Sequence, residues 1–250
     1  MRNRIPVELA RKRIFTIDEA EDEFNVDRMS LRVILHRLEV DGVLERLERG
    51  KYIVIPRTSR KGEYTLDEYV LGSMIIDPHA IAYWSALSYH GLTEQIPGTV
   101  FIQTTSRRKK QILTIFGVRY RIVRIADYKF FGEKPVWIED KSVNITDKEK
   151  TIIDCLDHPE YCGGISEPAK ALRDNVNEFN IGVLKEYSQR ISNTAVIRRL
   201  GYLCDLFKIS ITLPEVTSRN YLYLDPTMPH DGGTDSDWRL KVNIDPSELT

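Results

Sequence analysis

The chain has few cysteines and no long apolar segment. Three cysteines among 250 residues make an odd count, which argues against a disulfide framework and for a reducing compartment. No apolar run reaches the about 18 residues that span a bilayer. The opening letters, MRNRIPVELARKRIF, lack the apolar core of a signal peptide. The sequence therefore predicts a cytoplasmic protein without a membrane partner.

Motifs of the common enzyme classes are also missing. There is no glycine-rich phosphate loop ending in Lys-Ser/Thr, no Gly-x-Ser-x-Gly and no His-Glu-x-x-His. Cys155, His158 and Cys162 are close in sequence, but their spacing does not fit a tetrahedral zinc site and Cys204 is distant. We expect small buried cysteines near a helix end. We expect no metal, no other cofactor and no catalytic residue.

The overall charge does not mark a nucleic-acid-binding protein, because 36 Lys/Arg face 37 Asp/Glu. The distribution is uneven. Residues 105–134 hold 9 Lys/Arg and 2 Asp/Glu, whereas residues 205–250 hold 4 and 8. We therefore expect two different surfaces, one basic and one acidic. The basic one would bind an acidic partner or steady DNA. The candidate basic patch comprises Arg107, Arg108, Lys109, Lys110, Arg119, Arg121 and Arg124.

The N-terminal part of the chain carries two helix patterns followed by a hairpin pattern. A first helix is expected over 16–24, and a second, capped by Asp27, over 28–40. A glycine ends the second helix. Short strands are expected over 43–47 and 51–55, joined by a tight glycine turn. This order predicts a winged helix-turn-helix, a module that usually places one helix in the DNA major groove.

The second of these helices has two different sides. Leu31, Ile34, Leu35 and Leu38 form an apolar stripe at helical spacing, which should pack into a core. The opposite side would present polar and basic groups that can bond base edges and phosphates. The predicted DNA-binding residues are Arg28, Ser30, Arg32, His36 and Arg37 on the helix and Arg46, Arg49 and Lys51 in the wing.

The remainder of the chain mixes helices and strands after a polar linker over 57–64. Helices are expected over 67–76, 80–89, 147–157, 165–173, 181–191 and 195–207, and strands over 99–103, 111–115, 118–125, 136–139, 142–145, 221–224 and 238–242. The predicted fold class is α+β. Residues 1–60 would form the N-terminal winged helix-turn-helix DNA-binding domain, and residues 61–250 would form a larger α+β domain.

Several phrases resemble the AbiEi antitoxin family of type IV toxin–antitoxin and abortive-infection systems. They are ERLERGKYIVIP, AIAYWSALSYHGLTEQIPGTVFIQTT, ITDKEKTIIDCLDHPEYCGGISEPAKAL, LDPTMP and WRLKVNID. The resemblance covers nearly the whole chain. It implies a winged helix that binds inverted repeats in the double-stranded promoter DNA of its own operon and represses it. It also implies a C-terminal domain that counteracts a nucleotidyltransferase-type toxin without a stable complex, in a protein that is not an enzyme.

Two alternatives remain open. A stand-alone regulator would keep DNA binding and use its C-terminal domain to sense a ligand. A metal-dependent nuclease would use Asp127, Glu139 and Lys141, because carboxylates can hold Mg²⁺ while a lysine positions the nucleophile. The simpler interpretation of Glu139 and Lys141 is a charged turn between two strands.

Overall fold

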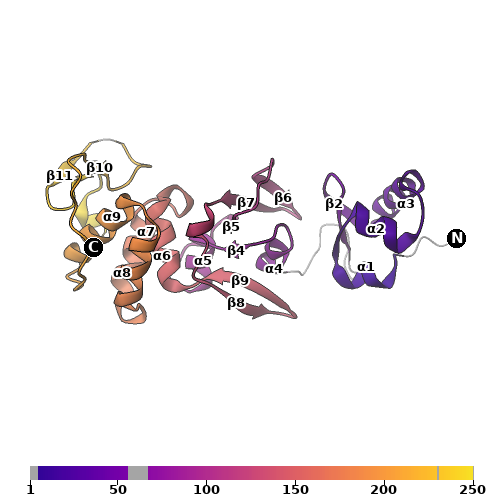
Figure 1. Cartoon of the computed structure of the whole chain (residues 1–250), viewed down its shortest axis with the longest axis horizontal. Coiled ribbons are helices and arrows are strands. Elements are labelled where there is room, and N and C mark those ends of the chain that lie inside the picture. Colours follow the sequence, from indigo (N-terminus) through magenta and orange to yellow (C-terminus); the bar gives the residue numbers. More distant parts are fainter. Residues whose placement is uncertain (1–4, 56–66, 230, 250) are drawn as a thin grey trace. The chain divides into compact units, whose positions relative to one another are not determined.

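The computed structural model describes residues 5–55, 67–229 and 231–249, which form two compact units with separate hydrophobic cores (Figure 1). The predicted α+β class, with a winged helix ahead of a larger α+β part, is confirmed. The predicted linker over 57–64 and the boundary at residue 60 lie outside the described residues.

The first unit has the complete element order of a winged helix. Its elements are α1 (Val7–Lys12), β1 (Ile14–Thr16), α2 (Ile17–Phe24), α3 (Arg28–Val40), β2 (Leu44–Glu48) and β3 (Lys51–Val54). The strands form an antiparallel sheet in the order β1-β3-β2. Sequence analysis predicted α2, α3 and the hairpin but missed α1 and β1. Both are too short to show a period, and β1 exists because it pairs with β3.

Local hydrogen bonds explain where α2 and α3 begin and end. The Thr16 hydroxyl accepts the Glu19 amide at 3.3 Å, while the Glu19 carboxylate accepts the Thr16 amide at 2.7 Å. The Asp27 carboxylate accepts two amides in the first turn of α3. Gly42, at φ 68°, takes the left-handed conformation that follows the end of α3. The predicted Asp27 cap of α3 is therefore confirmed.

The apolar side of α3 forms the centre of the first core. Leu31, Leu35 and Leu38 are 0% exposed. They pack with apolar residues from all the other elements of this unit, including Phe15 of β1, which stacks on Tyr52 of β3 at 5.9 Å. Because this side is buried, α3 can present only its opposite side to a ligand.

The larger unit is built on a six-stranded mixed sheet with the order β6-β7-β5-β4-β9-β8. Its strands are β4 (Ala80–Ile81), β5 (Thr99–Thr104), β6 (Ile112–Ile115), β7 (Val118–Arg124), β8 (Glu133–Ile138) and β9 (Lys141–Thr146). Helix α4 (Glu68–Ser73) lies on one face, where Gly72 approaches Ile81, Ile102 and Tyr120 so closely that a larger residue would not fit without movement. Phe101 points to the other face and joins the main core.

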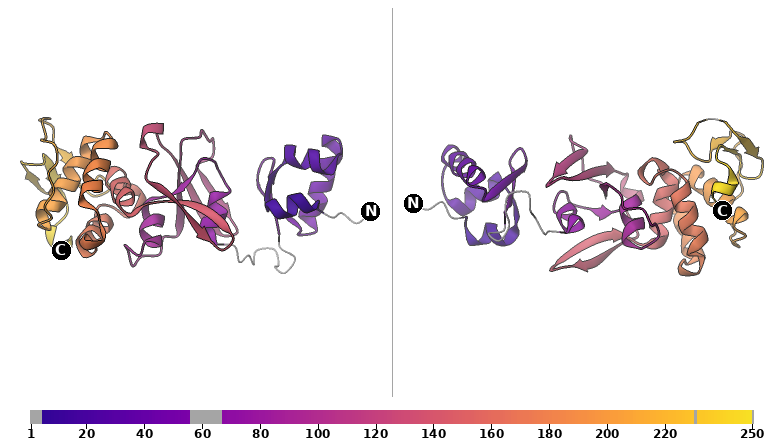
Figure 2. Two further views of the ribbon diagram at one scale, coloured as in Figure 1. Left: turned by 60° about the horizontal axis from the view of Figure 1, so that its bottom comes forward. Right: turned by 180° about the vertical axis from the view of Figure 1, so that it is seen from behind.

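Helices and a small sheet complete the larger unit beyond this second face. The helices are α5 (Tyr83–Tyr89), α6 (Lys148–Asp157), α7 (Ser166–Asp174), α8 (Ile181–Arg190) and α9 (Thr194–Leu206), and short 3₁₀ turns are η1 (Asp127–Lys129), η2 (Pro159–Tyr161), η3 (Val176–Glu178) and η4 (Pro246–Glu248). Helix α6 contacts α5, α7, α8 and α9 (Figures 1 and 2). The strands β10 (Leu222–Tyr223), β11 (Gly233–Asp235) and β12 (Leu240–Val242) form a sheet in the order β10-β12-β11.

The structure corrects three of the predicted elements. The expected helix over 80–89 begins as strand β4, because Ala80 and Ile81 pair with β5 and Ile81 also pairs with β9. Strand β8 begins at Glu133 rather than at residue 136, with Pro135 tolerated in an edge strand. Strand β11 lies between the predicted strands over 221–224 and 238–242, where no strand was predicted. It forms because pairing with β12 overrides its glycine-rich sequence. Within the described ranges, no helix is long and apolar enough to cross a membrane.

Candidate nucleic-acid interface

The exposed side of α3 carries three predicted DNA-binding residues with free side chains. Arg32, His36 and Arg37 are exposed. Among the residues that the structure describes, none offers these side chains a hydrogen bond or an ion pair. Their donors are therefore available to phosphate oxygens and to the acceptor atoms of bases in the major groove.

Two other predicted contacts of α3 are held inside the unit. The Arg28 guanidinium forms ion pairs with Asp18 at 2.5 Å and with Glu21 at 2.8 Å, both on α2. The Ser30 hydroxyl donates to Asp27 at 2.5 Å. Both groups therefore stabilise the helix-turn-helix, and a DNA contact by either would compete with these bonds. Spacing on α3 alone could not reveal this, because the carboxylates that hold Arg28 belong to α2.

The wing places its cations on and beside a tight turn. Arg46 and Arg49 are exposed, whereas Lys51 is half-buried. Gly50, at φ 79°, forms the turn, and its carbonyl accepts the amide of Ile17 at 2.8 Å. This bond links the turn of the wing to the start of α2, so the turn is held against the rest of the first unit.

A basic helix side next to a hairpin with further cations is the layout of a winged-helix DNA reader. Residues 4–55 match the family model described as transcriptional regulator, AbiEi antitoxin. The resemblance seen in the sequence is confirmed for this segment. The AbiEi match supports a DNA-binding regulator and antitoxin.

A solved structure extends the similarity to the fold of the larger unit. The crystal structure of the RV2827C protein from Mycobacterium tuberculosis is similar to this chain with a TM-score of 0.66 and 17% sequence identity. The match covers 97% of this chain and 90% of that one. At this identity the similarity shows the fold alone. No curated protein matches the chain.

The predicted basic patch in the larger unit is divided between two faces of its sheet. Arg119 and Arg121 lie on one face of β7, where the Arg121 guanidinium is 4.8 Å from the centre of the Tyr161 ring. Arg124 lies on the opposite face because side chains alternate along a strand. Arg108 donates to two backbone carbonyls. The other loop cations, Arg107, Lys109 and Lys110, are exposed. The predicted patch residues therefore do not all lie on one face of the sheet.

The residues of the nuclease alternative are not brought together. Glu139 lies in the turn between β8 and β9, with φ 53°, and Lys141 begins β9. Asp127 lies in η1, which precedes the other end of β8. A six-residue strand is about 20 Å long, so Asp127 is remote from the turn. In the described part of the chain, no group of three or more His, Cys, Asp or Glu side chains is placed to hold a metal.

The three cysteines are buried and unpaired, as predicted. The Cys162 thiol lies 3.3 Å from the carbonyl oxygen of Pro159 and 3.4 Å from that of Gly164. Burial raises the pKa of Cys155 well above its ordinary value and that of Cys204 to about 12. The thiols of Cys155 and Cys204 are therefore protonated near neutrality and act as small core side chains.

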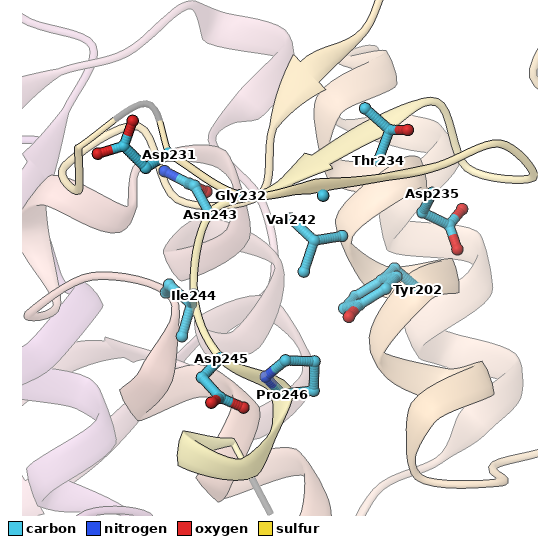
Figure 3. A pocket seen from close by; sticks show the side chains of 11 residues that line it. Tyr202, Asp231, Gly232, Thr234, Asp235, Val242, Asn243, Ile244, Asp245 and Pro246 are labelled. Atoms are coloured by element: carbon cyan, nitrogen blue, oxygen red, sulfur yellow. The ribbon is translucent and has the colours of Figure 1, made fainter.

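An open, acidic hollow lies beside the small sheet of the larger unit. It measures about 590 Å³ and is lined by Tyr202 of α9 and by residues of β11, β12 and the loops that flank them. Figure 3 shows the carboxylates of Asp231, Asp235 and Asp245 spaced apart around it. Asp235 and Asp245 each accept a hydrogen bond from a nearby backbone amide. None of the described residues that line the hollow is a lysine or an arginine, so it is a poor surface for phosphates.

His158 is expected to make the stability of the protein depend on pH near neutrality. Its ring bonds Glu160 at 2.9 Å and lies 3.5 Å from Asp157. Burial alone would lower the pKa of His158, but the bond to Glu160 and the two carboxylates raise it above the ordinary 6.5. The folded state therefore binds this proton more tightly than the unfolded state does. The stabilisation is complete below the unfolded pKa and is lost as the pH rises through the folded one.

The measurement is denaturant unfolding of the wild type and of His158→Gln between about pH 6 and pH 8. The stability difference between them should fall with rising pH by a few tenths to about 1 kcal/mol, the range for a partly exposed ion pair. The comparison isolates His158, because His79 and His90, whose pKa values burial lowers, are present in both proteins. A difference that stays constant across this range would contradict the prediction.

Proposed function

We propose that the chain is a transcriptional repressor that binds the double-stranded promoter DNA of its own operon through α3 and the wing. The observation that carries the proposal is the exposed side of α3, where Arg32, His36 and Arg37 have no partner among the described residues. The AbiEi match over residues 4–55 supports it. Arg46, Arg49 and Lys51 would grip phosphates from the wing, and Arg28 and Ser30 would chiefly hold the helix-turn-helix together.

The charge pattern of the first unit favours this assignment. Three of the carboxylates on α2 have ion-pair partners: Asp18 and Glu21 share Arg28, and Glu19 pairs with Lys12 at 2.8 Å. Part of the negative charge of α2 is therefore offset locally. The cations on the exposed side of α3 lack such counter-charges, so this side is the one that would attract a polyanion.

We further propose that the larger unit counteracts a nucleotidyltransferase-type toxin without a stable complex, in the cytoplasm, without a cofactor and without catalysis. This part rests on the sequence resemblance in the segments that form α5, α6 and α7. The residues of these segments have structural roles. Gly164, at φ 91°, lies against the Asp225 carboxylate, which also accepts the Ile165 amide at 2.7 Å. Cys155 and Cys162 belong to the main core.

A full-length variant can separate the two activities. Replacing Arg32 and Arg37 with alanine should derepress a reporter fused to the promoter that precedes the gene. The same variant should still protect cells from the neighbouring toxin gene, because the replaced side chains are exposed on α3 of the first unit and belong to neither hydrophobic core. The readouts are reporter level and cell survival.

Arg11→Ala is the matched control, since Arg11 is an exposed cation that pairs with Glu8 on α1. It should leave both readouts unchanged. Unchanged repression by the double variant would remove the DNA-binding assignment. Joint loss of repression and protection, with the protein folded and abundant, would remove the division of labour. Repression that responds to a small molecule, with no toxin gene nearby, would support the ligand-sensing alternative.

A further inference from the structure

The centre of the exposed side of α3 is apolar. Met29, Val33 and Val40 are 77%, 52% and 72% exposed. A surface helix normally places polar residues on the side that faces water, and single exposed apolar residues need no explanation. Here three of them share one stripe of one helix. At about 100° per residue, they lie within about 40° of each other and opposite the buried Leu31, Leu35 and Leu38.

The two arginines of α3 flank this stripe, and His36 borders it, about 20° from Met29 on the helical projection. On the same helical projection, Arg32 lies about 60° to one side of Met29 and Arg37 about 80° to the other side. A helix in the major groove directs the centre of its exposed side at the floor of the groove and its flanks at the walls. The centre would therefore meet base edges, while the flanking arginines would reach guanines or phosphates.

The major-groove floor has one apolar group, the C5-methyl of thymine. We propose that Met29 and Val33 contact thymine methyl groups in the major groove. The DNA sequence bound by α3 would then depend on thymines at these positions as well as on the bases whose acceptor atoms bond the arginines. This inference rests on the proposed DNA-binding function and adds which group of the bases α3 would contact. The two residues are four positions apart, which spans about 6 Å along the helix and matches about two base-pair steps.

A second copy of the chain is a poorer occupant of this stripe. A twofold contact through Met29 and Val33 would bring the Arg32 and Arg37 side chains of both copies to the same interface. Like charges placed together in an interface are unfavourable. A polyanion instead complements the flanking cations and the apolar centre at the same time. Val40 lies about 16 Å along the helix from Met29, beyond the N-terminal turns that usually contact base edges.

Deoxyuridine provides a direct test, because it lacks only the methyl group of thymine. The full-length protein first selects a duplex from a random library. Each thymine of that duplex is then replaced singly with deoxyuridine, and dissociation constants are measured by fluorescence anisotropy. We expect about fourfold weaker binding at the contacted thymines, the effect of about one buried methyl group, and no change at other thymines.

Variants assign each thymine to its side chain. Met29→Ala and Val33→Ala should each bind the thymine duplex more weakly and lose the deoxyuridine effect at one position only. Val40→Ala is the matched control and should behave as wild type. The proposal is overturned if no thymine is sensitive, or if sensitivity persists in both variants. It is also overturned if these variants change only the oligomeric state.

Failure of the proposed function would look different. In that case no duplex would be enriched from the library, or the enriched duplex would bind equally well to the variant with alanine at Arg32 and Arg37. Tight binding that depends on these arginines but ignores every thymine methyl would preserve the repressor assignment and remove only the thymine contacts.

Discussion

Replacing both Arg32 and Arg37 with alanine is expected to weaken binding to the promoter duplex by about thirtyfold or more. Each arginine that contacts a guanine or a phosphate contributes about 1–3 kcal/mol, and the lower limit for two corresponds to about thirtyfold in affinity. Both side chains are exposed and have no partner among the described residues. Their loss should therefore leave the fold unchanged, and the whole effect should appear in binding.

Salt dependence shows what kind of contact each arginine makes. Every phosphate contact that is lost should make the slope of log affinity against log salt shallower by about one unit. An arginine that reads a guanine should instead relax the preference at one base pair and leave the slope nearly unchanged. Arg11→Ala serves as the control cation. Affinity and slope equal to those of the wild type would show that DNA does not contact this side of α3.

Removing the Asp154 carboxylate is expected to destabilise the larger unit by about 3–5 kcal/mol. Asp154 accepts a hydrogen bond from the Lys150 ammonium, and Lys150 is 0% exposed. Burial raises the pKa of Asp154, because this site disfavours charge. Among the described residues, Asp154→Ala would leave the buried Lys150 ammonium with the face of the Phe131 ring, 4.8 Å away, as its remaining compensation. Removing one member of a buried ion pair typically lowers the free energy of unfolding by this amount.

Replacing both members of the pair tests whether the loss of stability comes from the uncompensated charge of Lys150. Lys150→Met together with Asp154→Leu should unfold at a denaturant concentration close to that of the wild type, because two apolar groups of similar size need no counter-charge. Glu178→Ala, which breaks the more exposed ion pair of Lys148 on the same helix, should change the stability by less than about 1 kcal/mol. A double variant as unstable as Asp154→Ala would show that the loss comes from packing.

The parts of the fold that were predicted correctly depend on neighbouring residues in the chain. Helices α2 and α3 follow from Thr16 and Asp27, which cap them, and from an apolar period that requires no knowledge of the partner elements. The same period placed Arg32, His36 and Arg37 on the exposed side. The α6 helix was predicted for the same reason, since Asp147 caps it through the Lys150 amide.

The parts that were missed or misjudged depend on residues that are distant in sequence. Strand β1 has three residues and exists through its pairing with β3. Ala80 and Ile81 have a sequence suited to a helix but form a strand between β5 and β9. Arg28, in the first turn of α3, was predicted to contact DNA, yet Asp18 and Glu21 of the preceding helix hold it. These outcomes require knowledge of the element that lies opposite.

The sequence by itself determined that this chain begins with a helix-turn-helix and wing and that one side of α3 is basic, because caps, periods and tight turns act within a few residues. Only the tertiary structure decided which cations remain free. It also showed that the Arg121 guanidinium of β7 lies over the Tyr161 ring, which belongs to an element distant in sequence. The partners of each charged residue depend on contacts between elements that are distant in sequence. The spacing of residues within one element does not show these contacts.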